Sequence, residues 1–343
     1  MPARRLRDQR IPDGVVREAG LDTPETAAWS SRSAVRNERA LRRSGHDETD
    51  QPPFVAGDGH RERAAGSSEG SSEASSEGKR VRKTAVVTGG ASGIGRAVAA
   101  ELARRGAHVT IADVRGTEDA AKDLGCAGVA CDVSDAQAVR ELITGVAAEH
   151  GRLDFLFNNA GIAVGGRAEE FTLDHWNRAI DVNLRGVVHG VHAAYPLMIE
   201  QGYGHIVNTA SLAGLTPAPM MLPYTATKHA VVGLSLALRA EAAAHRVRVS
   251  VVCPGFIDTP LLDNANPGLP QTEIGLHART TAVRAQGRLY PVESLARDVL
   301  RGVAGNQALI VAPASARATW RAVRLSPALA VRAAGSVLRR ITR

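Results

Sequence analysis

Thr88-Gly89-Gly90-Ala91-Ser92-Gly93-Ile94-Gly95 is the stretch that decides the fold. The apolar run from Thr84 to Val87 precedes it, and a helix-like run from Arg96 to Arg105 follows it. Glycines between a strand and a helix let the backbone turn tightly and approach phosphates, and the helix directs its free N–H groups at the anion. The sequence therefore predicts a cradle for the pyrophosphate of a dinucleotide.

Short apolar runs alternate with longer helix-like runs from Thr84 onward. The predicted strands are 84–87, 108–112, 129–132, 155–158, 205–209, 248–253 and 308–311, and the predicted helices include 93–105, 136–149, 173–189, 224–244 and 293–304. Strands that are apolar throughout are typical of sheets covered by helices on both faces. We therefore expect an α/β fold: a single Rossmann-like, doubly wound parallel sheet of about seven strands, with ligands at the carboxyl ends of the strands.

Three regions are predicted along the 343 residues. Residues 1–82 have little apolar periodicity and include a Gly/Ser/Glu run from Gly66 to Gly78, so we expect a disordered low-complexity extension. An alternative is that this extension is no natural part of the protein and was added upstream by a mis-assigned start codon. The extension lacks the apolar core of a secretory signal, and its acidic residues argue against a transit peptide. Residues 83–313 are the predicted catalytic domain, and residues 314–343 are a predicted basic helical tail.

Composition restricts the partners and the compartment. The formal net charge is +7, but aromatic residues make up 3% of the chain, and the sequence has neither a zinc-ligand spacing nor a basic region with heptads, so we expect no nucleic-acid partner and no metal. Cys126, Cys131 and Cys253 include no CxxC pair, which argues against a disulfide framework. No apolar run approaches the roughly 20 residues that span a bilayer. These features favour a protein of the reducing cytoplasm.

Two strand ends bear on the choice of cofactor. The second strand stops at Asp113, whose carboxylate can accept both hydroxyls of an adenosine ribose and repel the 2′-phosphate of NADP. This favours NAD, although Asp113 could instead start a turn, and nearby Arg115 keeps NADP open as a second cofactor. The third strand ends at Asp132-Val133, where the carboxylate either meets the adenine amine or belongs to the N-cap region of the next helix.

Three side chains carry the predicted chemistry. Tyr224 and Lys228 lie one helical turn apart, and Ser211 ends an apolar strand. A tyrosine with its usual pKa of about 10 is a poor base at neutral pH, but a neighbouring ammonium and an oxidised nicotinamide favour the phenolate. We therefore predict that Tyr224 exchanges a proton with a carbonyl or alcohol oxygen held by Ser211, while the cofactor moves the hydride.

The ordered set of motifs resembles the short-chain dehydrogenase/reductase family, in its compact branch with a TGxxxGxG glycine motif. The resemblance runs from about Thr84 to Val311 and rests on residues 88–95, Asn158-Asn159-Ala160-Gly161, Asn183, Ser211, Tyr224-x-x-x-Lys228 and Pro254-Gly255. It implies that Asn183 holds a water in a proton relay, that Lys228 also binds the nicotinamide ribose, and that Asn158 is either functional or purely structural. It further implies a homo-oligomer, a tetramer or a dimer.

The resemblance also implies a set of cofactor contacts. The pyrophosphate loop would use Gly89, Ser92, Gly93, Ile94 and Gly95. The remaining contacts would come from Asn159, Ala160, Gly161, Tyr224, Lys228, Pro254, Gly255, Ile257 and Thr259.

The substrate side is predicted to be apolar. In the resembled family, residues 258–291 form the substrate lid, and here this segment contains Leu261, Leu262 and Leu269. A mobile, partly apolar lid suits an apolar alcohol or ketone. Met220 and Met221 either add an adaptable wall to this site or simply pack in their loop.

The C-terminal tail is basic and amphipathic. Arg317, Arg321 and Arg324 fall together on a helical wheel. After Pro327, one face holds Arg332, Ser336, Arg339 and Arg343, opposite Ala330, Ala334, Val337, Leu338 and Ile341. Such a helix either packs on its own or a partner subunit, with its arginines in solvent, or makes peripheral contact with an anionic membrane.

These features together predict an NAD-preferring oxidoreductase that interconverts a secondary alcohol and a ketone. Three alternatives remain. One is an NADPH-dependent 3-oxoacyl-thioester reductase. Another is a non-catalytic nucleotide-sensing protein, against which the complete Ser–Tyr–Lys set argues. The third is a membrane-associated scaffold built on the basic tail.

Overall fold

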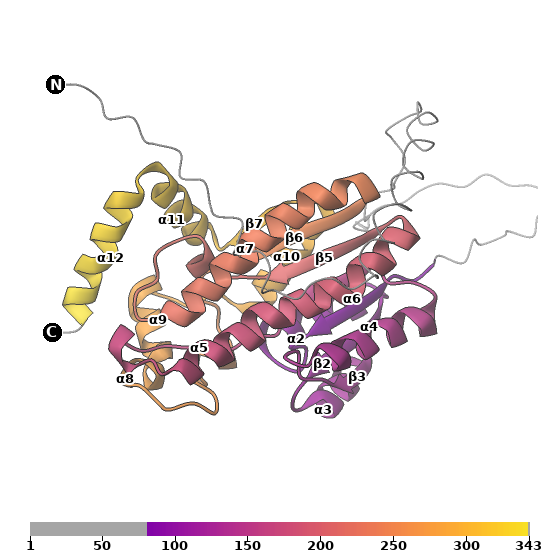
Figure 1. Cartoon of the computed structure of the whole chain (residues 1–343), viewed down its shortest axis with the longest axis horizontal. Coiled ribbons are helices and arrows are strands. Elements are labelled where there is room, and N and C mark those ends of the chain that lie inside the picture. The colour runs from indigo at the N-terminus through magenta and orange to yellow at the C-terminus, as the bar shows by residue number, and fades with distance from the viewer. Residues whose placement is uncertain (1–80, 342–343) are drawn as a thin grey trace, which may run out of the picture. The chain divides into compact units, whose positions relative to one another are not determined.

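A computed structural model describes residues 81–341, with side chains from 81 to 336. Seven parallel strands form one sheet in the order β3-β2-β1-β4-β5-β6-β7, and helices cover it (Figure 1). This confirms the predicted Rossmann-like sheet. The predicted disorder of residues 1–82 lies outside the described residues, except at its last two positions. Within 81–341, no helix combines the length and the apolar character needed to cross a membrane.

All seven predicted strands are present. They are β1 (Thr84–Thr88), β2 (His108–Asp113), β3 (Ala127–Ala130), β4 (Phe155–Asn158), β5 (Gly204–Thr209), β6 (Val247–Pro254) and β7 (Leu309–Ala312). The strand order reverses between β1 and β4, so a crevice opens at the carboxyl ends of these two strands. The third strand was predicted two residues too late. It stops at Ala130 because Asp132 begins a turn in which its Oδ1 accepts hydrogen bonds from the Ser134 N–H and hydroxyl.

Helices pack on both faces of the sheet. One face is covered by α2 (Gly93–Arg104), α3 (Thr117–Leu124) and α10 (Val292–Ala304), and the other by α4 (Ala136–His150), α6 (Gly186–Gln201) and α7 (Leu222–Ala242). Along β1, Ala85 and Val87 face the first layer and Val86 faces the second, and all three are fully buried. Two-sided burial explains why the strands are apolar without alternation.

The helix predicted over 173–189 is two helices joined by a wider turn. Helix α5 (Leu173–Ile180) leads into a π-helical turn, Asp181–Arg185, and then into α6. The side chain of Asn183, fully buried in this turn, accepts a 2.8 Å hydrogen bond from the Ile162 N–H and donates one of 3.1 Å to the Ile162 carbonyl. These bonds fasten the turn to the loop after β4. Single π-turns of this kind recur at functional sites.

The remaining helices follow or flank the cavity-forming loops. They are α8 (Glu273–Leu276), α9 (Ala278–Gln286), α11 (Ala314–Leu325) and α12 (Pro327–Ile341). The last two form the helical tail that the sequence predicted (Figure 1).

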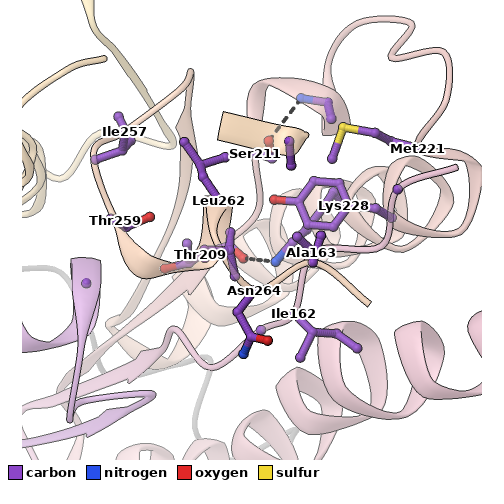
Figure 2. A pocket seen from close by; sticks show the side chains of 18 of the residues that line it. Ile162, Ala163, Thr209, Ser211, Met221, Lys228, Ile257, Thr259, Leu262 and Asn264 are labelled. Carbon is purple, nitrogen blue, oxygen red and sulfur yellow. Dashed lines mark hydrogen bonds between the residues drawn. The ribbon is translucent and has the colours of Figure 1, made fainter. Parts of the chain in front are cut away.

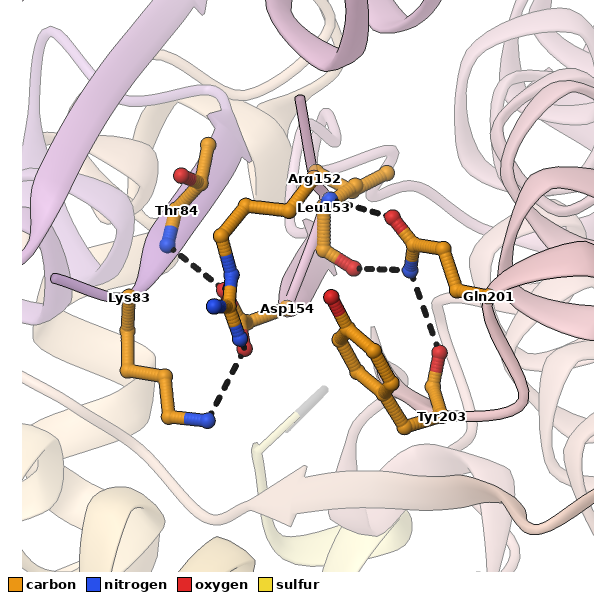
Figure 3. A network of polar contacts seen from close by, with 7 residues as sticks. All are labelled: Lys83, Thr84, Arg152, Leu153, Asp154, Gln201 and Tyr203. Atoms are coloured by element: carbon orange, nitrogen blue, oxygen red, sulfur yellow. Dashed lines mark hydrogen bonds and ion pairs between the residues drawn. The ribbon is translucent and has the colours of Figure 1, made fainter. Parts of the chain in front are cut away.

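A polar network closes the amino end of the sheet (Figure 3). The buried carboxylate of Asp154 accepts from the Thr84 N–H, from Lys83 Nζ and from two nitrogens of Arg152, at 2.6–3.0 Å. Burial alone would raise the pKa of Asp154, but these hydrogen bonds outweigh it and lower the pKa. Gln201 then joins the Leu153 backbone to the Tyr203 carbonyl. The network ties the start of β1 to β4 at the end of the sheet opposite the cavity.

Candidate active site

A cavity of about 1230 Å³ lies at the carboxyl ends of the strands. The glycine loop, the ends of β2, β5 and β6, the loop after β4, the start of α7 and the lid segment contribute its walls. Of the site residues predicted from the sequence, all but Gly95 and Asn183 line it. Its size exceeds the usual range for one small ligand and suits a dinucleotide together with a substrate.

The glycine loop has the backbone geometry that close approach to phosphates requires. Gly89 and Gly93 have φ angles of +64° and +51°, which side-chain-bearing residues rarely adopt. A Cβ on Gly95 would lie 2.1 Å from the Gly89 carbonyl oxygen, so Gly95 shapes the loop from behind the cavity wall. Ser92 is the N-cap of α2 but makes no side-chain cap, and the first turn contains no acidic residue. The N-terminal N–H groups of α2 are therefore suited to an anion, as a pyrophosphate cradle requires.

Two adjacent asparagines, the last residue of β4 and the one after it, have different roles. Asn159 Nδ2 donates to the carbonyl oxygens of Thr88 and Gly89, at 3.2 and 3.3 Å, and so holds the glycine loop. Asn158 is buried, does not line the cavity, and donates to Asn208 Oδ1 at 2.9 Å. Of the two readings open for Asn158, the geometry therefore favours the structural one.

The predicted adenosine half of the cavity contains fixed carboxylates. Asp113 accepts hydrogen bonds from the N–H groups of Ala91 and Val114, at 3.1 and 2.8 Å, which hold its carboxylate beside the glycine loop. Arg115 also lines this half and is exposed. Burial would raise the pKa of Asp132, but the hydrogen bonds from Ser134 outweigh it and lower the pKa. The N-cap of α4 is Asp135 rather than Asp132. The second carboxylate oxygen of Asp132, Oδ2, lies 3.8 Å from a guanidinium nitrogen of Arg178.

The predicted catalytic side chains meet on the floor of the cavity. Tyr224 and Lys228, 8% and 3% exposed, both line it together with Ser211. Lys228 Nζ donates a 2.9 Å hydrogen bond to the Thr209 carbonyl, as Figure 2 shows, and lies 5.6 Å from the centre of the Tyr224 ring. A Cβ on Gly161 would lie 3.0 Å from Asn183 Oδ1 and 3.5 Å from Lys228 Nζ, so the glycine lets these two groups approach. Asn183 thus lies behind the wall but close to the lysine.

Burial dominates the electrostatics of these groups. It raises the pKa of the Tyr224 phenol, against the opposing effect of a hydrogen bond with Ser211. It also lowers the pKa of Lys228 to about 8, and it raises that of the neighbouring Cys253 thiol to about 12. Without a bound cofactor, desolvation of the phenolate is thus the largest influence on the pKa of Tyr224, and the prediction that lysine and an oxidised nicotinamide together favour the phenolate stays a prediction.

Two polar side chains that the sequence analysis missed hold the loop after β6. Gln286 Oε1 accepts from the Phe256 N–H at 2.9 Å and its Nε2 donates to the Phe256 carbonyl at 2.8 Å. Arg279 donates to the Thr259 carbonyl at 3.0 Å and pairs with Asp258 and Asp263, each at 2.6 Å. Helix α9 therefore fixes the loop that presents Ile257 and Thr259 to the cavity.

The lid segment is fastened by a second set of contacts that was not predicted. Asn266 is fully buried, has a φ of +55°, and hydrogen-bonds both the N–H and the carbonyl of Gly165, at 3.0 and 2.9 Å. Thr272 also donates to the Gly165 carbonyl, and His175 Nε2 lies 3.0 Å from the Pro270 carbonyl. The Asn266-Pro267-Gly268 turn was the available signal in the sequence.

The substrate half of the cavity is almost without charge. Among the described residues that line it from Ser211 to the lid, Lys228 is the one charged side chain. The apolar lining includes Ala163, Leu212, Pro217, Met220, Met221, Leu261, Leu262, Leu269 and Ile274. Met221, Leu262 and the polar Asn264 are drawn in Figure 2. Met220 and Met221 thus line this half, as one of their two readings expected.

Comparisons with known proteins agree on one family. The family model described as short chain dehydrogenase matches residues 83–270. D-beta-hydroxybutyrate dehydrogenase of Rhizobium meliloti is 35% identical over 199 residues, which are 55% of this chain and 77% of that protein. D-threitol dehydrogenase of Mycolicibacterium smegmatis is 41% identical over 186 residues, 52% of this chain and 72% of that protein. The crystal structure of a short chain dehydrogenase/reductase from Burkholderia phymatum in complex with NAD superposes with a TM-score of 0.65 at 33% identity, covering 70% of this chain and 92% of that one.

Proposed function

This chain belongs to the short-chain dehydrogenase family, and on that premise we propose that it is an NAD-preferring oxidoreductase that interconverts an apolar secondary alcohol and its ketone. We assign the reaction to the domain 83–313. The observation that carries the proposal is the meeting of Tyr224, Ser211 and Lys228 on the floor of one cavity, between the glycine loop and an apolar lid.

The catalytic residues divide the work of moving one proton. A bound nicotinamide supplies or accepts the hydride. The Tyr224 hydroxyl donates its proton to the carbonyl oxygen in reduction, and in oxidation the Tyr224 phenolate accepts the alcohol proton. Ser211, whose hydroxyl lowers the pKa of that phenol against the effect of burial, orients the substrate oxygen. Lys228, held by the Thr209 carbonyl, stabilises the phenolate that remains after the proton leaves.

The preference for NAD rests on Asp113. Its carboxylate is fixed beside the glycine loop by two backbone N–H groups, where it suits the ribose hydroxyls and opposes a 2′-phosphate. The solved relative in complex with NAD supports the same cofactor class. Asn159, Ala160 and Gly161 would complete the adenosine side, and Ile257 and Thr259 the nicotinamide side.

The charge of the substrate half bears on substrate class. A hydroxy acid, such as the one named in the relative from Rhizobium meliloti, carries a carboxylate that a site normally meets with a fixed cation. Here Lys228 is the one charged side chain among the described residues of that half, and it is already engaged by Thr209. An uncharged, apolar alcohol or ketone therefore fits better. Assembly as a dimer or tetramer stays a prediction.

The decisive experiment is a substrate screen read by NADH absorbance. Apolar cyclic and steroid alcohols, hydroxy acids, polyols and 3-oxoacyl thioesters are each offered with NAD(H) and, in parallel, with NADP(H). Turnover of an uncharged apolar alcohol with NAD supports the proposal. Faster turnover of a 3-oxoacyl thioester with NADPH would replace it with the alternative reductase, and cofactor binding without turnover of any class would favour a nucleotide sensor.

A further inference from the structure

The C-terminal tail holds the whole net charge of the protein. Residues 314–343 contain seven arginines and no aspartate or glutamate, while the chain as a whole has a formal charge of +7. The other residues are therefore neutral in sum. A charge so confined creates a local positive potential rather than a generally basic protein.

Within the described residues this charge faces solvent. Arg321, Arg324 and Arg332 are exposed, and none of them forms an ion pair with another described residue. Arg324 lies over the Trp320 ring, 5.3 Å from its centre. The charges are thus displayed rather than neutralised by neighbouring carboxylates.

Large apolar side chains are exposed on the same two helices. Leu325, Leu329 and Val331 are 88%, 61% and 60% exposed. Helix α11 is anchored to the domain through buried Ala316 and partly buried Trp320, whereas α12 packs mainly against α11 (Figure 1). Neither helix is long and apolar enough to span a bilayer. Arginines beside exposed leucines on a short helical pair are typical of a segment that lies in the plane of a membrane surface.

The tail also borders the cavity. Thr319 of α11 and Ala334 of α12 line the same cavity as Tyr224, together with Ala278, Ala282 and Ala285 on or beside the inner side of α9. Helices α11 and α12, which carry the exposed arginines and leucines, therefore lie at the rim of the apolar half of the cavity.

We propose that the α11–α12 pair docks this protein on anionic phospholipid bilayers, with the rim of the cavity turned toward the lipid. The exposed leucines disfavour a nucleic acid as the occupant, because a phosphate backbone offers them no apolar surface. Like charge disfavours contact of the tail with the same tail of a second copy. Docking of this kind goes beyond the proposed reaction and does not depend on it.

The test is flotation of the full chain with vesicles of phosphatidylcholine, either alone or mixed with phosphatidylglycerol. We expect binding to the mixed vesicles that falls as salt is added, and little binding to phosphatidylcholine alone. The triple variant Arg321→Gln, Arg324→Gln, Arg332→Gln should bind the mixed vesicles roughly 100-fold more weakly, at about five-fold per charge. The double variant Leu325→Ser, Leu329→Ser keeps the charge and should bind roughly ten-fold more weakly.

A matched control removes the same charge elsewhere. Arg140→Gln, Arg248→Gln and Arg297→Gln change exposed residues of α4, β6 and α10 and should leave vesicle binding unchanged. Absence of binding by the unaltered chain, or unaltered binding by the tail triple variant, would overturn the proposal. So would tail-dependent binding to a DNA duplex, or tail-dependent self-association, without vesicle binding.

Discussion

Asn266 and Gly165 are 101 positions apart, yet the side chain of one hydrogen-bonds both backbone groups of the other. The amide of Asn266 takes the place that a neighbouring strand would take, and the adjacent Ala163–Ala265 bridge extends the pairing. The lid is thereby joined to the loop after β4, which also carries Gly161 and Ile162 beside Asn183.

Replacement of Asn266 by glycine should loosen the lid and leave the cofactor site intact. Glycine tolerates the φ of +55°, so the change removes the hydrogen bonds without backbone strain. The buried Gly165 N–H loses its partner at a cost of about 1–3 kcal/mol, while the Gly165 carbonyl keeps the hydrogen bond from Thr272, so we expect faster hydrogen exchange across 258–276 and a higher KM for substrate. Gln271→Ala, which removes a donor to the Asn266 carbonyl, is the milder control. Unchanged exchange in Asn266→Gly would contradict the role of this contact.

Tyr224→Phe should abolish turnover while NADH binding persists. The variant keeps the ring, its burial and its distance from Lys228 but removes the proton that the substrate oxygen needs. A fall of at least 100-fold in kcat is expected for loss of a general acid. NADH fluorescence titration measures the retained binding. Tyr290→Phe, whose hydroxyl donates to Asp298 outside the cavity lining, should keep its activity. Residual turnover near the wild-type level in Tyr224→Phe would remove this side chain from the mechanism.

Lys228→Met should stabilise the cofactor-free protein at pH 7 and inactivate it. Burial lowers the folded-state pKa of Lys228 to about 8 from 10.5, so below pH 8 the fold contains a desolvated ammonium. That pKa shift corresponds to a destabilisation of roughly 3 kcal/mol, which the substitution removes. The substitution also removes the hydrogen bond to Thr209, at a cost of about 1 kcal/mol. The expected gain is about 1–2 kcal/mol in the free energy of unfolding.

The stability difference between Lys228→Met and the wild type should depend on pH. Between pH 8 and 10.5 the unfolded lysine binds a proton that the folded one does not, so the wild type gains stability as pH rises. Urea unfolding at several pH values should therefore show the advantage of Lys228→Met shrinking over that range. A variant less stable than the wild type at pH 7 would show that the buried ammonium does not destabilise the fold.

Asp113→Ser should shift the cofactor preference. Loss of the carboxylate removes the acceptor for the ribose hydroxyls and the repulsion of a 2′-phosphate. We expect kcat/KM for NAD to fall about ten-fold, equal to about 1.4 kcal/mol, and that for NADP to rise. Adding Arg115→Gln to this variant tests whether the exposed arginine then meets the phosphate. An unchanged ratio of the two cofactors in Asp113→Ser would exclude Asp113 as the discriminating group.

Deletion of residues 1–78 should leave both activity and thermal unfolding unchanged. The deletion retains Lys83 and Thr84, which bind the Asp154 carboxylate at the start of β1. A longer deletion through Thr84 should lower the Tm by several degrees, because Asp154 then remains buried with fewer partners. Calorimetry of both truncated forms makes the comparison. If the shorter deletion already prevents folding, the extension is part of the folded domain.

Regular periodicity and fixed motif order made the sheet predictable. Apolar runs gave all seven strands, and the glycine stretch gave the strand–turn–helix unit at its centre. The π-helical turn could not be predicted, because it depends on the contact of Asn183 with Ile162, a tertiary interaction. Helix α3 was missed because its short sequence, TEDAAKDL, is mostly polar and buries little beyond two alanines.

The lining of the cavity was predictable where a motif marks the residue, as at Tyr224, Lys228 and Asp113, whose chemical roles stay predictions. The residues that position others were missed, among them Asn266, Arg279 and Gln286. Their functions exist only through backbone groups distant in the sequence. The burial that raises the pKa of Tyr224 was missed as well, because the extent of desolvation is set by packing and has no local sequence signal.

The hydrogen bonds between Asn266 and the main chain of Gly165 have a consequence for how the substrate selectivity of this fold can change. Since the attachment uses no side chain of the partner segment, the residues that face the chamber, such as Leu261, Leu262 and Leu269, take no part in it. These side chains can be replaced by others of different shape while the lid stays attached at Gly165. Selectivity for new molecules can therefore be acquired in small steps, without rebuilding the frame that holds the reacting groups.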